Sequence, residues 1–175
     1  MKIYALLISL LFLGNAMAQK VDYDKKLSSL GIELFAPPKP KFNYVKSVRV
    51  GNLVYLAGHG STKADGSNLT GKVGKDVTVE QGVEAARIAT ISLLASLKAE
   101  IGSLNKVKRI VKVTGWVNCT DDFTDQSKVM NGCSDLLVAI FGEMGLHVRS
   151  SIGTNSLPNN FTTEIEMVVE MNNLF

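Results

Sequence analysis

The chain of 175 residues has little cysteine, little histidine and no dense run of positive charge. Its 2 cysteines, Cys119 and Cys133, fall at a predicted strand end and on a predicted helix, so we expect them to stay unpaired and the fold to rest on a hydrophobic core. The net charge is only +3 and the basic residues are dispersed, which does not indicate a surface built to bind nucleic acid. What remains is the composition of a soluble globular domain whose chemistry depends on particular residues.

The scarcity of histidine argues against a metal centre. His59 and His147 are far apart in the sequence, and neither has a cysteine or carboxylate at a metal-ligand spacing. Residues 66–72, Gly-Ser-Asn-Leu-Thr-Gly-Lys, have the spacing of a phosphate-binding loop, but Val73 stands where the magnesium-binding hydroxyl belongs. We therefore expect no metal site, and we interpret residues 66–72 as part of a surface loop.

Only one long hydrophobic run is present, and it stands near the start of the chain. Lys2 precedes an apolar run from Ile3 to Leu13, and Ala-Met-Ala at 16–18 matches a small-x-small cleavage site. This pattern predicts that residues 1–18 are a signal peptide cleaved near Ala18, and that the mature protein is exported, to the periplasm or outside the cell. The run is short for a membrane span and no second one follows, so we expect no integral membrane protein.

The rest of the chain divides into an arm and a domain. Residues 19–41 are a short polar segment followed by the proline-rich stretch Leu34–Pro40, whose prolines disfavour helix and predict an extended arm lying on the domain. Residues 42–175 are predicted to form a single domain.

Hydrophobic periodicity predicts two helices and five strands in this domain. A capping box at Thr78–Gln81 begins the first helix, and an apolar stripe at helical spacing continues to Ile101. The second helix is expected to end at Gly145. The first two strands are joined at Gly51-Asn52, a dipeptide typical of a tight hairpin turn. The predicted strands are 45–50, 53–57, 107–117, 147–152 and 162–171, and the predicted helices are 78–101 and 126–144.

The order of these elements is hairpin, helix, strand, helix, hairpin. Both helices carry one apolar face, so we expect them to cover the same face of one mixed sheet in an α+β sandwich. The other sheet face would then carry Val168, Ile110 and Trp116 beside polar residues, and the chain has no third layer to cover it. Association of several copies through this face is a natural way to bury it.

Two charged residues in the last predicted hairpin are candidates for function. Arg149 lies in a strand between Val148 and Ile152, where an unpaired guanidinium is costly, and arginine suits bidentate recognition of a carboxylate. Glu164 lies on the next strand, so a hairpin could bring the two side chains together. The residues alone favour a structural ion pair between them. The functional alternative gives Arg149 a substrate carboxylate and Glu164 a water molecule.

Arg149-Ser-Ser, Leu157-Pro158 and Glu164-Ile-Glu166 together resemble the C-terminal signature of the RidA (YjgF-like) family of enamine/imine deaminases. Residues 51–58, Gly-Asn-Leu-Val-Tyr-Leu-Ala-Gly, are similar to the first hairpin of the same family. The resemblance extends over residues 43–171. It implies a chorismate-mutase-like α+β domain, assembled as a homotrimer with clefts between the subunits.

The same resemblance implies roles for five residues. Arg149 would bind the carboxylate of a 2-imino acid, and Glu164 would position or deprotonate the attacking water. Tyr44 matches a tyrosine that borders the family's cleft, Asn131 matches an asparagine of the second helix, and Ser151 stands where many members have cysteine. No metal or organic cofactor is implied, because the C=N carbon is already electrophilic. The products would be a 2-keto acid and ammonia.

The chain departs from the family pattern near the implied cleft, which leaves the substrate open. Asn43-Tyr44-Val45, Ala57-Gly58-His59 and His147-Val148-Arg149 replace the usual Gly-Pro-Tyr-Ser, Ser-Gly-Gln and Pro-Ala-Arg. The proline arm resembles a longer subfamily often labelled putative endoribonuclease, but the sequence offers no basic groove, aromatic stacking set or histidine pair for RNA cleavage. A non-catalytic module that binds a small carboxylate is the second hypothesis, and a ribonuclease is the third.

Overall fold

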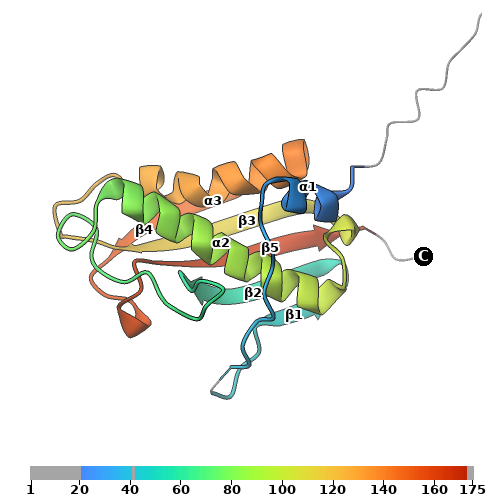
Figure 1. The fold of residues 1–175 in the computed structure, drawn as a ribbon, viewed down its shortest axis with the longest axis horizontal. Coiled ribbons are helices and arrows are strands. Elements are labelled where there is room, and N and C mark those ends of the chain that lie inside the picture. The colour runs from blue at the N-terminus through green and yellow to red at the C-terminus, as the bar shows by residue number, and fades with distance from the viewer. Residues whose placement is uncertain (1–20, 41, 173–175) are drawn as a thin grey trace, which may run out of the picture.

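The computed structural model describes residues 21–40 and 42–172, so the predicted signal peptide at 1–18 lies outside the described residues. Figure 1 shows two layers, a mixed sheet and the long helices that lie on one of its faces, which confirms the predicted α+β sandwich. The helices are α1 (Tyr23–Ser29), α2 (Val79–Ile101) and α3 (Gln126–Phe141), with short 3-10 turns at Leu104–Lys106, Gly142–Gly145 and Pro158–Asn160. The strands are β1 (Ser47–Val50), β2 (Leu53–Gly60), β3 (Val107–Asn118), β4 (Val148–Thr154) and β5 (Thr163–Met171).

The sheet has the order β1-β2-β5-β3-β4, and only the pair β3 and β4 is parallel. The first predicted hairpin, β1 and β2, is confirmed. The last predicted hairpin is wrong, because β4 pairs with β3 and β5 lies on the other side of β3. Burial explains this arrangement. Every second residue of β5 from Thr163 to Met171 is buried, as in a central strand, whereas β4 has no fully buried residue, which suits an edge.

The hydrophobic core lies between the sheet and the two long helices. The predicted capping box of α2 is present, because Gln81 N donates to Thr78 Oγ1 (3.2 Å) and Thr78 N donates to Gln81 Oε1 (2.8 Å). The helices approach closely at Gly132 of α3, where any side chain would overlap the backbone carbonyl of Val83. Cys119 and Cys133 are both buried in this core and are unpaired, as expected.

Several element boundaries differ by a few residues from those predicted, and two of these differences bear on the site. α3 ends at Phe141 and not near Gly145, because Gly142 (φ 59°) already takes the left-handed conformation that ends a helix. β2 continues to Gly60, so His59 belongs to the strand, and its ring is buried against α2.

The sequence does not predict α1, a short helix inside the arm. The Tyr23 ring packs edge-on against Phe141 of α3, with 4.9 Å between the ring centroids, and Asp24 pairs with Lys98 of α2 at 2.8 Å. A helix of 7 residues is too short to show a periodicity and depends on such tertiary contacts for its stability. The following stretch, Leu34–Pro40, forms neither helix nor strand.

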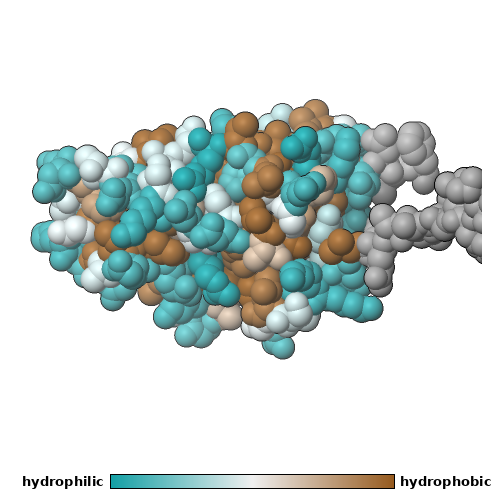
Figure 2. All heavy atoms as spheres, turned by 90° about the horizontal axis from the view of Figure 1, so that it is seen from above, coloured by the Kyte–Doolittle hydropathy of each residue, from teal (hydrophilic) through white to brown (hydrophobic). Residues whose placement is uncertain are grey.

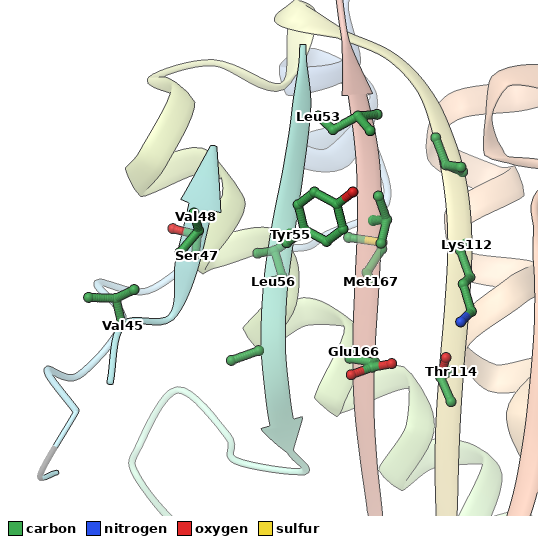
Figure 3. Close-up of a pocket in the computed structure, with 13 residues that line it drawn as sticks. Val45, Ser47, Val48, Leu53, Tyr55, Leu56, Lys112, Thr114, Glu166 and Met167 are labelled. Carbon is green, nitrogen blue, oxygen red and sulfur yellow. The ribbon is translucent and has the colours of Figure 1, made fainter. Parts of the chain in front are cut away.

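The sheet face opposite the helices, called the open sheet face below, is uncovered in residues 21–40 and 42–172. Figure 3 looks onto it, with the helices behind the strands. Tyr55 and Val168 line a largely apolar hollow of about 550 Å³ on this face, and Tyr55 is 46% exposed. Trp116 also points to this face, but Ile110 is fully buried beneath the helices. A bulge in β3 between Ile110 and Lys112 reverses the alternation of side chains along the strand. Counting every second residue, as the sequence prediction does, therefore assigns Ile110 to the wrong face.

The edge of the molecule along α3 mixes polar and apolar residues. Figure 2, which views the molecule from above Figure 1, shows an apolar band crossing a largely polar surface. Val138, Met144 and Leu146, at and after the end of α3, are among the exposed large apolar side chains. Within the described ranges, no helix is both long and apolar enough to cross a bilayer.

Candidate functional site

Arg149 lies on the helix-covered face of β4, in a cradle of neutral acceptors from α3. Its NH1 group donates to Asn131 Oδ1 (3.1 Å) and to Ser134 Oγ (2.9 Å), and its NH2 group donates to the Ser127 carbonyl (3.2 Å). A guanidinium has five N–H donors, so Nε–H and one NH2 proton remain for another acceptor. No carboxylate of the described chain pairs with Arg149. The cradle therefore fixes the guanidinium without neutralising it.

His147 supports this cradle from behind. Its Nδ1–H donates to the Gly145 carbonyl (2.6 Å), which leaves Nε2 unprotonated to accept from Ser134 Oγ (3.1 Å). Burial lowers the pKa of His147; the Gly145 carbonyl raises it, and the charge of Arg149 lowers it further. The imidazole is therefore neutral, and the Ser134 oxygen presents its lone pairs to the guanidinium.

Ser151 lies on the same side of β4 as Arg149. It is opposite Gly115 of β3, where any side chain would overlap Met130 of α3, so both residues face the helical layer. The Ser151 hydroxyl is buried and has no hydrogen-bond partner among the described residues. Arg149, Asn131 and Ser151 are thus brought together as one polar group beside α3.

Glu164 is a half-buried carboxylate on the open sheet face. It lies over Gly58 of β2, where a side chain would overlap its Oε1 atom, so the glycine makes room for the carboxylate. Within the described residues its side chain has no hydrogen bond or ion pair. Burial raises the pKa of Glu164, and the negative charge of Glu166 raises it further. A carboxyl group whose pKa is raised accepts and holds a proton more readily than an ordinary glutamate, which suits it to proton transfer.

Arg149 and Glu164 lie on opposite faces of the sheet, so the predicted meeting of the two side chains in a hairpin is wrong. Arg149 is opposite Val113 in the register, and Val113 is opposite Met167; both are buried under the helices. Glu164 is three residues from Met167 along β5 and therefore points the other way. A structural ion pair within one chain is excluded for the same reason.

Tyr44 belongs to the side of the molecule that carries Glu164. It is 52% exposed in the segment before β1 and lines a cavity of about 540 Å³ together with Gly58. The five candidate residues thus form two separate groups. The first is Asn131, Arg149 and Ser151 beside α3, and the second is Tyr44 and Glu164 near the end of β2.

His59 is a structural residue. Its Nδ1–H donates to the Ala57 carbonyl (2.7 Å) and its Nε2 accepts from Ser96 Oγ of α2 (2.7 Å). Burial, with a smaller effect from the charge of Lys46, lowers the pKa of His59 to about 4, although its bond to the Ala57 carbonyl opposes this shift. Both ring nitrogens are in use and the ring stays neutral. In the described part of the chain, no three His, Cys, Asp or Glu side chains cluster closely enough to hold a metal ion.

Sequence reasoning missed two members of the Arg149 cradle. Ser127 and Ser134 contact the guanidinium together with Asn131. The three residues are spaced four and three apart on α3, so they form a polar stripe along one side of the helix. The side chains of Asn131 and Ser134 in that stripe are visible in the sequence as polar residues beside a strong apolar side, whereas Ser127 contributes its main-chain carbonyl, which no residue type signals.

Comparison with known proteins identifies the family. The model of the family described as YjgF/chorismate mutase-like, putative endoribonuclease matches residues 24–171. The chain is a member of the YjgF/RidA-like family. The chorismate-mutase-like fold expected from the sequence is thereby confirmed. Protein TCP17 of Trypanosoma cruzi is 38% identical to this family member over 148 residues, which cover 84% of this chain and 92% of that protein.

Solved structures similar to this chain agree with this fold. Protein Atu1372 of Agrobacterium tumefaciens, of unknown function, has a TM-score of 0.78 and 36% identity, covering 86% of this chain and 94% of that one. A protein of Shewanella oneidensis titled a putative endoribonuclease has a TM-score of 0.83 and 30% identity, covering 86% and 100%. RidA from an Antarctic Psychrobacter shares the fold at a TM-score of 0.54 and 21% identity, covering 80% and 98%. Membership therefore establishes the fold, whereas the names of these proteins do not agree on one reaction.

Proposed function

We propose that this protein is a cofactor-independent hydrolytic deaminase of small 2-imino and enamino acids, and that it acts as a homotrimer with its sites between subunits. The observation that carries the proposal is a pair of uncompensated charges on opposite faces of one sheet. Arg149 is held by neutral acceptors on one face, and Glu164 has no partner among the described residues on the other. Half-buried charges without partners are costly, so each is expected to serve a ligand.

A second copy of the chain supplies what one copy lacks. The open sheet face exposes apolar side chains such as Tyr55 and Val48, and burial of apolar surface is worth roughly 25 cal/mol per Å². Contacts between unlike surfaces of identical subunits close into a ring when the rotation allows it. In the proposed trimer, Arg149 of one subunit faces Glu164 of the next, and the cleft between them is the active site.

The proposed reaction begins with orientation of the substrate. The free N–H donors of Arg149 bind the carboxylate of the imino acid in a bidentate manner, and the unpaired Ser151 hydroxyl lies on the same side. Glu164 takes a proton from water while the water oxygen bonds to the imine carbon. The electrons of the C=N π bond move to nitrogen, which receives the proton back from Glu164. The product of this step is a carbinolamine.

Collapse of the carbinolamine completes the reaction. Glu164 takes the hydroxyl proton and delivers it to nitrogen, the C–N bond breaks with its electrons leaving on ammonia, and the C=O bond forms. One water is consumed, and one 2-keto acid and one ammonia are released. The raised pKa of Glu164 suits both steps, because a carboxyl group that titrates closer to neutral pH accepts and returns protons readily.

The test is ammonia release from 2-iminobutanoate generated in situ by an amino-acid oxidase. Glu164→Gln is expected to lower kcat about 10²- to 10⁴-fold, as loss of a general base does. Arg149→Ala is expected to raise KM and lower kcat/KM, while Arg109→Ala, which removes an exposed guanidinium of β3, serves as the matched control. The molar mass from light scattering is expected to be that of a trimer. An unchanged rate in Arg149→Ala or Glu164→Gln would overturn the proposed roles.

Two other functions are separated by the same experiments. A non-catalytic binding module would bind a small carboxylate through Arg149 without turnover, which calorimetry detects. A ribonuclease would need groups for phosphodiester cleavage, but His59 and His147 are neutral and each uses both ring nitrogens. RNA cleavage by rigorously purified protein, lost in Glu164→Gln, would favour that function instead.

We also propose that the protein acts after export. The support is the charged start, apolar run and Ala-Met-Ala site within residues 1–18. N-terminal sequencing of the mature protein from its native host is expected to begin at Gln19. An intact N-terminus in the cytoplasmic fraction would overturn this localisation.

A further inference from the structure

The cavity lined by Tyr44 and Gly58, called the arm cavity below, is larger than a three- or four-carbon imino acid requires. Its volume is about 540 Å³, within the range of roughly 300–1,000 Å³ typical of ligand pockets. The proline-rich arm forms one wall with apolar side chains such as Phe35, Pro38 and Phe42. The opposite wall is polar and includes Thr62 and Ser92. The arm cavity can therefore hold a ligand that has both an apolar chain and a polar end.

Lys46 lines the arm cavity and has no partner for its charge. The described residues contain no ion pair or side-chain hydrogen bond to its ammonium group, and burial lowers the pKa of Lys46. Glu100 shares a neighbouring hollow with Lys46, but its carboxylate accepts a hydrogen bond from Ser47 Oγ (2.8 Å). No Asp or Glu of the described chain lines the arm cavity, and its other cation is Lys39. An anion is the missing partner.

The arm cavity meets the Glu164 half of the proposed site at Gly58. Tyr44 and Gly58 line it, and Gly58 is the residue over which the Glu164 carboxylate lies. A substrate with its imine carbon at Glu164 would direct its side chain into the arm cavity. Lys46 would then meet the far end of that side chain.

We propose that Lys46 binds a second carboxylate at the far end of the substrate, so that the preferred substrates are 2-imino dicarboxylates. This inference rests on the proposed function, since it assigns the specificity of the same site. The reaction is unchanged: a 2-imino dicarboxylate and water give a 2-oxo dicarboxylate and ammonia. Lys46 remains protonated and forms no covalent bond, so it acts as a specificity-determining residue.

The experiment compares 2-iminoglutarate with 2-iminobutanoate, each generated in situ by an amino-acid oxidase. The wild type is expected to have the higher kcat/KM for 2-iminoglutarate. Lys46→Met keeps the aliphatic stem and is expected to lower that kcat/KM about tenfold or more, with 2-iminobutanoate changed less than about twofold. Lys46→Arg restores part of the preference. Lys75→Met, which removes an exposed charge in the loop before α2, is the matched control.

The outcomes separate this inference from the proposed function. Hydrolysis of 2-iminobutanoate with no effect of Lys46→Met on 2-iminoglutarate overturns the role of Lys46 and leaves the deaminase standing. If neither imine is hydrolysed, the deaminase fails, and calorimetry with glutarate decides the role of Lys46. Weaker glutarate binding by Lys46→Met, with butyrate binding unchanged, then supports the second-carboxylate site, and equal binding by both proteins overturns it.

Discussion

Mixing two inactive variants tests whether the active site lies between subunits. Arg149→Ala loses the guanidinium but keeps Glu164, and Glu164→Gln loses the carboxylate but keeps Arg149. Because the two side chains point to opposite faces of one sheet, an intact site requires Arg149 from one chain and Glu164 from its neighbour. In randomly mixed rings, half of the chains carry an intact Arg149 and the other half carry an intact Glu164. A site needs one of each from neighbouring chains, so about a quarter of all sites are restored before the mixed rings are purified.

The assay is ammonia release per site after the two variants have been unfolded together and refolded, or co-expressed with different affinity tags. At a substrate concentration well below KM, each parent alone is expected to retain less than about 1% of the wild-type rate. The mixed trimers, isolated through both tags, are expected to recover about a third of the wild-type rate, because each of them has one intact site among its three. Parents mixed without subunit exchange provide the control. Doubly tagged trimers that remain as inactive as the parents would refute an active site shared between Arg149 and Glu164 of different subunits.

Three further variants test individual contacts. Gly58→Ala places a methyl group where the Glu164 carboxylate lies; we expect unchanged thermal unfolding but a kcat reduced about 10- to 100-fold, and an unchanged kcat would contradict this position of the reacting carboxylate. Glu166→Gln removes a charge that raises the pKa of Glu164, so the acidic limb of the pH–rate profile should move to lower pH; a shift to higher pH would show the sign to be wrong. His147→Ala removes support for the cradle of Arg149 and should raise KM for the carboxylate substrate more than it lowers kcat. His147→Gln should restore part of the affinity. Equal loss of affinity in both variants would show that His147 only fills space.

Much of the fold could be predicted from local patterns. The capping box at Thr78, the apolar stripe that ends at Ile101 and the alternation along β5 each depend on neighbouring residues in the chain, and each is present as predicted. The order of the strands could not be predicted in this way. Alternation tells which face a side chain occupies, but it does not tell which strand lies beside it, and β3 therefore lies between two strands that were expected to pair.

The candidate site shows the same limit. The residue types of Arg149 and Glu164, and the resemblance of the segments around them to a known family, predicted a functional role for both. Their positions on opposite faces of the sheet depend on long-range strand pairing, which these local patterns do not show. Ile110 illustrates the effect of one extra residue, since a bulge moved it from the expected open face into the core. Lys46 carries no local motif, and only the folded arm shows that the described residues around the arm cavity place no Asp or Glu beside it there.

The two histidines of the chain share one geometry. In each ring Nδ1–H donates to the carbonyl two residues earlier, and Nε2 accepts from a serine of a long helix, Ser96 for His59 and Ser134 for His147. Each histidine therefore works as a neutral strut between the sheet and the helical layer, and the pKa of both is lowered. Histidine is the residue that ordinarily changes charge between pH 5 and 8. Because the pKa of both rings is lowered, neither histidine adds a positive charge at neutral pH, and the attraction of the protein for anions there depends on its arginines and lysines.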